Sequence, residues 1–460
     1  MNEYTTSGGL CLFTPAASLV GIGLYVRKTK LFDPVRDLVK IAQKTVKHSP
    51  ADKLYDAFIS ILNGARGLVQ INTGLRADPA LQMAFGRCAC AEQSVVQETL
   101  SASAQDNVVQ MQQALDRIYR CQSAGYRHDY TKAWQLLDAD LSGLPCGKKA
   151  ALACKGYFGE SHHRRGRQMG RVVATSYHEV VVDQLYPGNS YLAANLQTLM
   201  TAAELALELD EAKRARTILR IDSGGGTVQH INWALERGYR VHTKDYSAER
   251  VQVLAKGITD WVDDPVVPGR QVAWVTASAP QYVQPVRRIA ARCRRQNGQW
   301  GVGVIVSTLS EEEVLQVVDL PEAARRSAHM VLLAYVYFYD DRGGAIETAI
   351  KDDKQGLGIT KRNKKRFEAQ QMVMMLGTLA HNTVIWARGW LAAREAKLAD
   401  YGVLRLVRDV FHVSGRVLYD VHTCEQTIIL NRLAPLAREL AAALGDLLKP
   451  MQVTVILDKT

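Results

Sequence analysis

The chain has 460 residues, a formal net charge of +11, 47% hydrophobic and 22% charged residues, and eight cysteines. This length predicts two or three domains, and the composition is that of an ordinary soluble globular protein and excludes a dense disulfide framework. The positive surplus favours a polyanionic partner, with a basic soluble enzyme as the alternative. No apolar run reaches membrane-spanning length without polar breaks, so we expect an intracellular protein.

The first part of the chain is predicted to be helical. From about residue 33 to residue 126, apolar residues recur three and four positions apart, as at Phe58 and Ile61. Residues 80–102 predict a helix, a glycine-bearing turn and a second helix that starts near Ala91. A helix-turn-helix can place its second helix in the major groove of DNA, whereas two helices of a plain bundle are the alternative.

After Trp134, strand-like runs alternate with helices, which predicts a mixed α/β sheet. The expected strands are 134–142, 151–158, 171–182, 217–222 and 239–245, and the expected helices between them are 190–215 and 228–237. Short strands with Pro and Gly between them predict a β-rich insertion at 247–320. The apolar run 329–339 predicts one more strand, and everything after residue 367 predicts helices.

Acidic residues lie where these elements end or begin. Asp138 and Asp140 close the first strand, Asp222 closes a later one, and Glu347 opens a helix after the insertion. Carboxylates gathered from such distant segments can bind Mg²⁺, which activates water or a 3′ hydroxyl for phosphodiester chemistry. Acids at strand ends are common, so their spacing alone leaves an ordinary surface role open.

The segment YFYDDRGGAIETAIKDDK, residues 337–354, places charged residues in a regular pattern. Two glycines after Arg342 predict a helix start, and the offsets from Glu347 put Lys351 and Lys354 on the same helix face. A metal-binding glutamate with lysines that contact phosphates is one interpretation. A solvated Glu–Lys helix pair is the other, and it leaves Tyr339 and Arg342 unexplained.

These residues resemble the Tyr-Arg-Glu-Lys signature of DDE transposases, in the large bacterial insertion-sequence group that carries it. The signature positions here are Tyr339, Arg342, Glu347 and Lys354. The segments LDADLSGLPCGKKA, GRQ, LYPGN and LRIDSGGGTVQHINWALERGYRV look similar as well, so the resemblance spans roughly residues 130–390. One departure is that four residues separate the arginine and the glutamate, where family members often have three.

The resemblance implies an α/β fold: an RNase H-like mixed sheet with helices on both faces, a β-rich insertion, and helical N-terminal and C-terminal domains. The expected segments are a mostly helical DNA-binding domain, the first part of the core, the insertion, the second part of the core with the glutamate, and a helical C-terminal region. They cover residues 1–130, 131–246, 247–325, 326–375 and 376–460.

The resemblance also implies that Asp140, Asp222 and Glu347 are the catalytic metal ligands for two Mg²⁺ ions, with Mn²⁺ as a substitute. Asp140 is chosen because the family aspartate is usually followed two residues later by Thr or Ser, here Ser142. Asp138 remains an alternative, since residues two apart on a strand face the same way.

Basic residues are the expected contacts to DNA, because cations that bind phosphates release counterions. The expected contacts are Tyr339, Arg342, Lys351, Lys354, Lys361, Arg362, Lys364, Lys365, Arg366, Arg164, Arg165 and Arg167. The runs HHRRGR, KRNKKR and RRIAARCRR supply much of the charge. Trp261, Trp274 and Trp300 lie in the insertion, where the resemblance suggests base stacking by an aromatic residue; core packing is the alternative.

The resulting hypothesis is a transposase that binds the terminal inverted repeats of an insertion sequence, cleaves the element ends and joins the 3′ hydroxyls to target DNA. The resemblance implies a homodimer on paired double-stranded DNA ends, in the bacterial cytoplasm with the nucleoid. The alternatives are an RNase H-like nuclease without transposition and a non-catalytic DNA-binding relic. A third is a nucleotide-cofactor enzyme such as a methyltransferase, whose glycine loop would be SGGG at 223–226.

Overall fold

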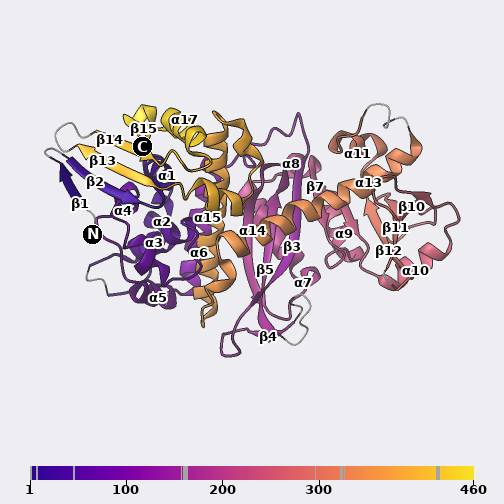
Figure 1. The fold of residues 1–460 in the computed structure, drawn as a ribbon. Coiled ribbons are helices and arrows are strands. Elements are labelled where there is room, and N and C mark those ends of the chain that lie inside the picture. Colours follow the sequence, from indigo (N-terminus) through magenta and orange to yellow (C-terminus); the bar gives the residue numbers. More distant parts are fainter. Residues whose placement is uncertain are drawn as a thin grey trace. The chain divides into compact units, whose positions relative to one another are not determined.

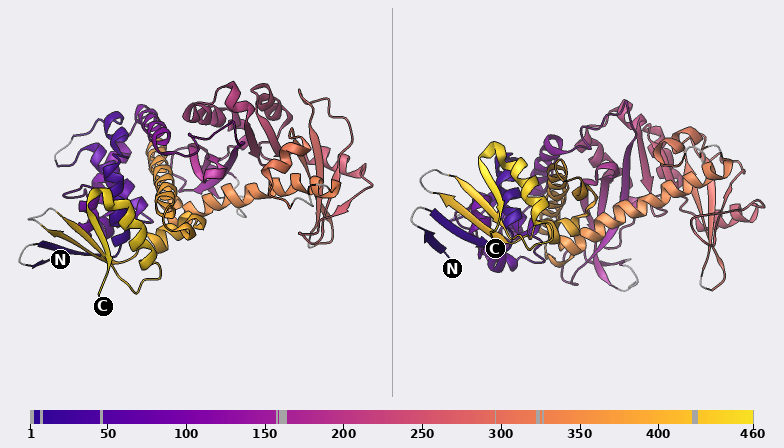
Figure 2. Two further views of the ribbon diagram at one scale, coloured as in Figure 1. Left: turned by 90° about the horizontal axis from the view of Figure 1, so that it is seen from above. Right: turned by 45° about the horizontal axis from the view of Figure 1, so that its top comes forward.

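The chain forms two compact units in the computed structural model (Figures 1 and 2). The first unit comprises Met1–Ser123, Pro145–Ala153 and Ala349–Thr460, and the second comprises Ala124–Leu144 and Cys154–Thr348. The structure describes residues 3–6, 9–44, 47–156, 158, 164–295, 297–321, 325, 327–420 and 425–459. Among them, no helix is both long enough and apolar enough to cross a membrane.

The first unit combines the helices of the N-terminal part with those of the C-terminal part (Figure 1). The earlier helices are α1 (Ala17–Lys28), α2 (Asp33–Leu38), α3 (Pro50–Leu62), α4 (Pro79–Ala84), α5 (Gln93–Ala102) and α6 (Gln105–Gln122). The later ones are α14 (Thr348–Gly356), α15 (Phe367–Ala392), α16 (Val403–Arg405) and α17 (Ala437–Leu448). The helical periodicity expected for residues 33–126 is confirmed, and α4 and α5 lie on either side of the glycine-bearing turn expected within residues 80–102. A DNA-binding role for these two helices stays a prediction.

A mixed sheet in the first unit corrects the prediction of an entirely helical C-terminal region. Its strand order is β1-β2-β13-β14-β15, antiparallel except between β14 and β15. The strands are β1 (Glu3–Thr6), β2 (Gly9–Thr14), β13 (Gly415–Asp420), β14 (Gln426–Leu430) and β15 (Val453–Leu457). The run from 406 to 421 was expected to be helical. Leu406–Val410 is helical, but Gly415–Asp420, which contains Val417 and Tyr419, pairs with β2 from the other end of the chain.

Helix α15 packs at the centre of this unit. All residues from Ala369 to Ala387 are buried, so other parts of the unit surround this stretch of the helix on every side. It packs against α3, α5, α6 and α17. The N-terminal and C-terminal parts therefore share one core, which explains why they form one unit.

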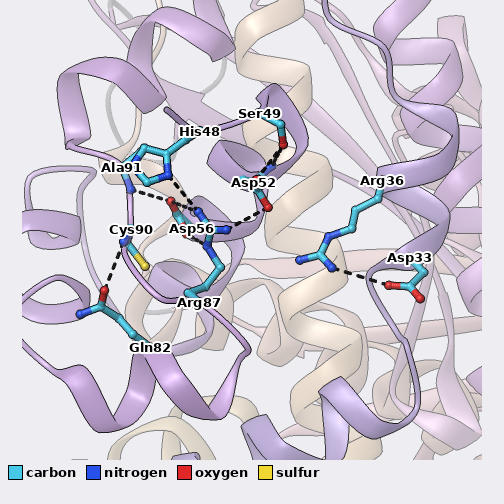
Figure 3. Close-up of polar contacts among 10 residues, drawn as sticks. All are labelled: Asp33, Arg36, His48, Ser49, Asp52, Asp56, Gln82, Arg87, Cys90 and Ala91. Atoms are coloured by element: carbon cyan, nitrogen blue, oxygen red, sulfur yellow. Dashed lines mark hydrogen bonds and ion pairs between the residues drawn. The ribbon is translucent and has the colours of Figure 1, made fainter. Parts of the chain in front are cut away.

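A buried ion pair ties the turn between α4 and α5 to helix α3 (Figure 3). Arg87 Nε donates to Asp56 Oδ1 at 2.8 Å, and Arg87 Nη1 lies 2.9 Å from Asp52 Oδ1. The other Asp56 oxygen accepts the backbone N–H of Ala91 at 2.8 Å. Asp56 is fully buried and Arg87 is 9% exposed, so each charge depends on the other for compensation.

The second unit is built on one long mixed sheet with the order β4-β5-β3-β7-β8-β12-β11-β10-β9, and β6 pairs with β5. Its first strands are β3 (Gln135–Pro145), β4 (Cys154–Lys155), β5 (Arg165–Ala174), β6 (Glu179–Pro187), β7 (Thr217–Ile221) and β8 (Arg240–Lys244). The insertion adds β9 (Val262–Asp263), β10 (Arg270–Trp274), β11 (Arg287–Arg294) and β12 (Trp300–Ser307). Strands β3, β7 and β8 are parallel, and the insertion strands are antiparallel.

The helices of this unit cover the sheet. They are α7 (Leu192–Leu207), α8 (Glu211–Ala215), α9 (Val228–Glu236), α10 (Ala248–Lys256), α11 (Glu311–Val317) and α13 (Ala328–Arg342). Figure 2 shows α13 along one face of the sheet, with the helices of the 190–240 segment on the other. The mixed α/β class is thus confirmed. The single strand expected at 171–182 is instead β5 and β6 around a turn, in which His178 has a φ of 57°.

The strand expected at 329–339 is wrong, because this segment is the helix α13. An uninterrupted apolar run does not distinguish a buried strand from a buried helix, although eleven residues is long for a strand. Here α13 packs against β10, β11 and β12 and forms a core with Ile218, Ile289 and Ile305. The run is apolar throughout because its helix is enclosed almost all round.

The ion pair around Arg87 leads to a stability prediction. Arg87→Met leaves Asp56 buried without its cation, which should lower the free energy of unfolding by about 3–5 kcal/mol. The matched control is Arg36→Met, which removes a half-exposed pair with Asp33 and should cost about 1 kcal/mol or less. Urea unfolding followed by circular dichroism measures both, and equal losses would contradict a special role for the buried pair.

Candidate active site

The two predicted aspartates lie at the same level of neighbouring parallel strands. In the register of β3 and β7, Ala139 is paired with Ile221. Asp140 and Asp222 are therefore the next residues on the two strands, at the carboxyl end of the parallel part of the sheet. Side chains alternate along β7, so Asp222 faces the same side as Arg220, the side on which α13 lies.

Arg342, the last residue of α13, contacts two of the three predicted acids. Its Nη2 lies 3.1 Å from Asp140 Oδ2 and also donates to the carbonyl of Ala139 at 3.1 Å. Its Nη1 lies 3.9 Å from Glu347 Oε1. The guanidinium is almost fully buried, whereas the Glu347 side chain is 65% exposed. The fold thus brings Asp140, Glu347 and Arg342 together, and Asp222 lies beside Asp140.

Burial and mutual repulsion in this cluster disfavour the ionised form of Asp140. Burial raises the pKa of Asp140 to about 6; the charge of Arg342 opposes that rise, and the negative charge of Asp222 adds to it. One Asp222 oxygen, Oδ1, is buried without a hydrogen-bond partner among the described residues. Burial likewise raises the pKa of the Tyr339 hydroxyl, and the nearby acids contribute to the increase.

These side chains fit a hard divalent cation in donor chemistry. Carboxylate oxygens are the ligands that Mg²⁺ prefers, and the unsatisfied Asp222 oxygen beside Asp140 is the kind of group that a cation would satisfy. As the side chains stand, the described residues contain no group of three or more His, Cys, Asp or Glu that could hold a metal ion. Arg342 supplies the positive charge between Asp140 and Glu347 instead.

A π-helical turn, Gly343–Glu347, connects α13 to α14 and accommodates the unusual spacing between Arg342 and Glu347. In a regular α-helix, a residue five positions away points about 140° from the first. A π-turn holds one extra residue per turn, which brings position i+5 back to the same face. Glu347 therefore faces Arg342 in spite of the four residues between them.

Asp138, the alternative first ligand, has a different partner. Its two oxygens accept from Arg220 Nε at 2.6 Å and Nη2 at 2.8 Å, and both side chains are fully buried. Arg220 Nη1 also donates to the carbonyl of Phe338 at 2.8 Å. Asp138 faces α13, as expected. Through Arg220 it is linked to Phe338, which lies one turn of α13 before Arg342. Asp140 remains our candidate ligand.

The basic residues expected to bind DNA separate into exposed and buried groups. Six of them have exposed side chains: Arg164, Arg165, Lys351, Lys361, Lys365 and Arg366. Three others are at most 6% exposed, namely Arg167, Arg362 and Lys364, and a contact of these side chains with DNA stays a prediction. Lys364 Nζ donates to Gln97 Oε1 at 2.6 Å on α5, so KRNKKR partly serves to pack the first unit.

The remaining predicted residues lie in both units. Tyr339 is 8% exposed and lies on α13 in the second unit, one turn before Arg342. Lys351 and Lys354 lie on α14 within the first unit, so their placement relative to Glu347 stays a prediction. His162 and His163, from the run HHRRGR, lie outside the described residues.

The tryptophans of the insertion have protein partners. Trp274 packs edge-on against Tyr335, with ring centroids 5.5 Å apart. The guanidinium of Arg292 lies 3.9 Å from the ring centroid of Trp261 and 4.5 Å from that of Trp300. Trp274 therefore belongs to the core, whereas Trp261 and Trp300 enclose an arginine at the insertion.

The glycine turn 223–226 has a packing explanation. A Cβ on Gly226 would come within 1.9 Å of the Lys244 carbonyl oxygen, and one on Gly225 within 2.5 Å of Ile221 Cγ2. The glycines let the turn approach β8 closely, so a cofactor-binding loop is not needed to account for them. The methyltransferase alternative thereby loses its main motif.

Sequence reasoning missed Lys244, the last residue of β8. Its ammonium lies 4.4 Å from the centre of the Tyr339 ring, and burial lowers its pKa from the usual value. The signal was available, because Lys244 lies near the end of the predicted strand 239–245, which follows the strand that carries Asp222, and parallel strands align their carboxyl ends.

Acids from two adjacent parallel strands and from a helix, gathered beside a buried arginine, define an acidic site of the kind that processes phosphodiesters. The chain belongs to the family described as Transposase DDE domain group 1, whose family model matches residues 4–452. It is accordingly a DNA transposase, an enzyme of DNA recombination, and DDE transposases generally use divalent metal ions.

Comparison with curated proteins finds no match. Among solved structures, the chain is similar to the cryo-EM structure of the piggyBac transposase synaptic complex with hairpin DNA. The sequence identity is 10% and the TM-score 0.45, over 86% of this chain and 79% of that chain.

The two aspartates of β3 should respond differently to substitution. Asp138→Asn weakens a buried ion pair and should lower the free energy of unfolding by up to about 3–5 kcal/mol. Asp140→Asn removes both the repulsion from Asp222 and the pair with Arg342, so it should change stability less than Asp138→Asn does while abolishing DNA cleavage. Urea unfolding and a cleavage assay on both variants measure this. A stable but inactive Asp138→Asn beside an active Asp140→Asn would contradict the assignment.

The π-turn also makes a prediction about chain length. Deletion of Gly344 should convert the π-turn into an α-turn, keep the glutamate facing Arg342 and retain cleavage. Insertion of one alanine after Gly344 should rotate the glutamate by about 100° and abolish cleavage. Cleavage assays with both variants, after circular dichroism has shown that each is folded, measure this. Activity in the insertion variant and none in the deletion variant would show that the π-turn does not set the position of the glutamate.

Proposed function

We propose that this transposase binds the terminal inverted repeats of a bacterial insertion sequence, cleaves DNA strands at the element ends and joins the 3′ hydroxyls to target DNA. The observation that carries the proposal is the gathering of Asp140, Asp222 and Glu347 around the buried Arg342. These residues come from three distant segments, and one buried Asp222 oxygen has no hydrogen-bond partner among the described residues, which a bound cation would supply.

We propose that the core is RNase H-like. The run of strands β6-β5-β3-β7-β8, with β3, β7 and β8 parallel and β5 and β6 antiparallel, supports this proposal. The strands of the insertion continue the same sheet beyond β8, and α13 leads from there back to the acids.

Asp140, Asp222 and Glu347 would hold two Mg²⁺ ions, with Mn²⁺ as a substitute. When bound, these ions supply the Lewis acidity that activates the attacking oxygen and stabilises the leaving oxygen of the phosphodiester. The side chain of Glu347 is largely exposed, so it can turn towards the aspartates without disturbing the core.

The other residues of the proposal position DNA. Arg342 neutralises the acids and would contact the strand near the cleaved bond, with Tyr339 beside it, while Lys351 and Lys354 would contact neighbouring phosphates. The exposed residues Arg164, Arg165, Lys361, Lys365 and Arg366, together with α4 and α5, would bind the element ends. A homodimer on paired DNA ends, in the bacterial cytoplasm, completes the proposal.

The test is a cleavage and strand-transfer assay on labelled DNA that carries the element ends. Glu347→Gln should abolish cleavage and joining in Mg²⁺ or Mn²⁺ but retain DNA binding, because the substitution removes a metal ligand and no basic residue. The control is Glu249→Gln, an exposed glutamate on α10 outside the site, which should behave as the wild type.

Two outcomes contradict the proposal. Cleavage that persists in EDTA would show that the reaction does not need a divalent metal ion. Cleavage without any joining to target DNA would instead indicate a nuclease that does not transpose.

A further inference from the structure

A cavity of about 460 Å³ in the second unit opens beside the proposed metal ligands. Its lining includes Ser223, which directly follows Asp222, together with Lys244, Tyr339, Cys293 and Gly303. A Cβ at Gly303 would lie 3.7 Å from Lys244 Cε. Because glycine has no side chain, the Lys244 side chain remains accessible from the cavity at this point.

The cation of Lys244 has no acidic partner within ion-pair distance in the described part of the chain. The residue is half-buried, the ring face of Tyr339 lies 4.4 Å from the ammonium, and the charges of Asp340 and Asp222 act on it from beyond ion-pair distance. By contrast, Arg270 in the same wall is paired with Asp264 at 2.6 Å and with Asp340. A cation–π contact and distant charges compensate desolvation only in part, so Lys244 lacks the direct ion pairs that Arg270 has.

The register of the sheet places this cation next to the acids. Ile221 pairs with Thr243 in the parallel strands β7 and β8, so Asp222 and Lys244 are the residues that follow at the same edge. An anion bound by Lys244 would therefore lie about one nucleotide away from a DNA phosphate held at the acidic cluster. In a DNA-processing enzyme, the anion available at that position is a backbone phosphate.

We infer that Lys244 binds a backbone phosphate of the DNA strand that occupies this cavity, next to the bond that is cleaved. This inference rests on the proposed function and adds a substrate-binding residue to it. Tyr339 then has two roles, since its ring orients the lysine and its position on α13 places it one turn from Arg342.

The experiment compares cleavage of end DNA by Lys244→Gln, Lys244→Arg and the control Lys256→Gln, an exposed lysine at the end of α10. Lys244→Gln should lower kcat/KM at least tenfold, Lys244→Arg should restore a large part of it, and Lys256→Gln should match the wild type. The melting temperature of Lys244→Gln should stay equal or rise, because the change removes a desolvated charge. Wild-type cleavage by Lys244→Gln, or a loss matched by a lower melting temperature, would overturn the inference.

A second measurement uses the exposed Cys293 in the same cavity and does not depend on a folded variant. End DNA should slow alkylation of Cys293 by N-ethylmaleimide in the wild-type protein, as read by peptide mass spectrometry. Equal alkylation rates with and without DNA would overturn the inference. Asp222→Asn separates the two proposals: if it is inactive while Lys244→Gln is active, only the inference about Lys244 fails, and if it cleaves DNA normally, the proposed function fails.

Discussion

The position of the buried guanidinium of Arg342 is the constraint on which the acidic site depends. It holds the end of α13 against β3 through the Asp140 carboxylate and the Ala139 carbonyl, and it lies within ion-pair distance of Glu347. One turn earlier, Arg220 makes the corresponding contact between β7, Asp138 and α13. Four helical residues and two strand residues each advance about 6–7 Å, so the two arginine contacts fix the helix along the strand in one register.

That register has an electrostatic consequence. Placing Asp140 in a largely buried pocket beside Asp222 raises the pKa of Asp140, mainly through burial and further through the negative charge of Asp222. The cost is tolerable because Arg342 compensates part of the charge, yet an Asp222 oxygen stays unsatisfied. Local arrangements that cost stability in this way are characteristic of functional sites, where a ligand or substrate supplies the missing partner.

Much of this arrangement could be predicted from the sequence, since strand periodicity placed Asp222 at the end of β7 and the family signature connected both aspartates to Glu347. Asp140 was expected to close its strand, but β3 continues to Pro145, and only its parallel pairing with β7 ends before Asp140. The prediction was wrong for the apolar run that forms α13, because a fully enclosed helix and a buried strand have the same composition. The C-terminal strands were missed because their pairing partner, β2, is at the other end of the chain. The burial of Lys364 could not be predicted either, since it depends on a tertiary contact with α5.

The most direct test of the account is to map where a divalent metal binds. Fe²⁺ substituted for Mg²⁺, with ascorbate and peroxide, generates hydroxyl radicals that cut the polypeptide next to the ion. The account predicts cuts near Asp140, Asp222 and Glu347 that excess Mg²⁺ suppresses and that Asp222→Asn abolishes. Cuts confined to other segments, or cuts near these residues that Mg²⁺ does not suppress, would contradict it.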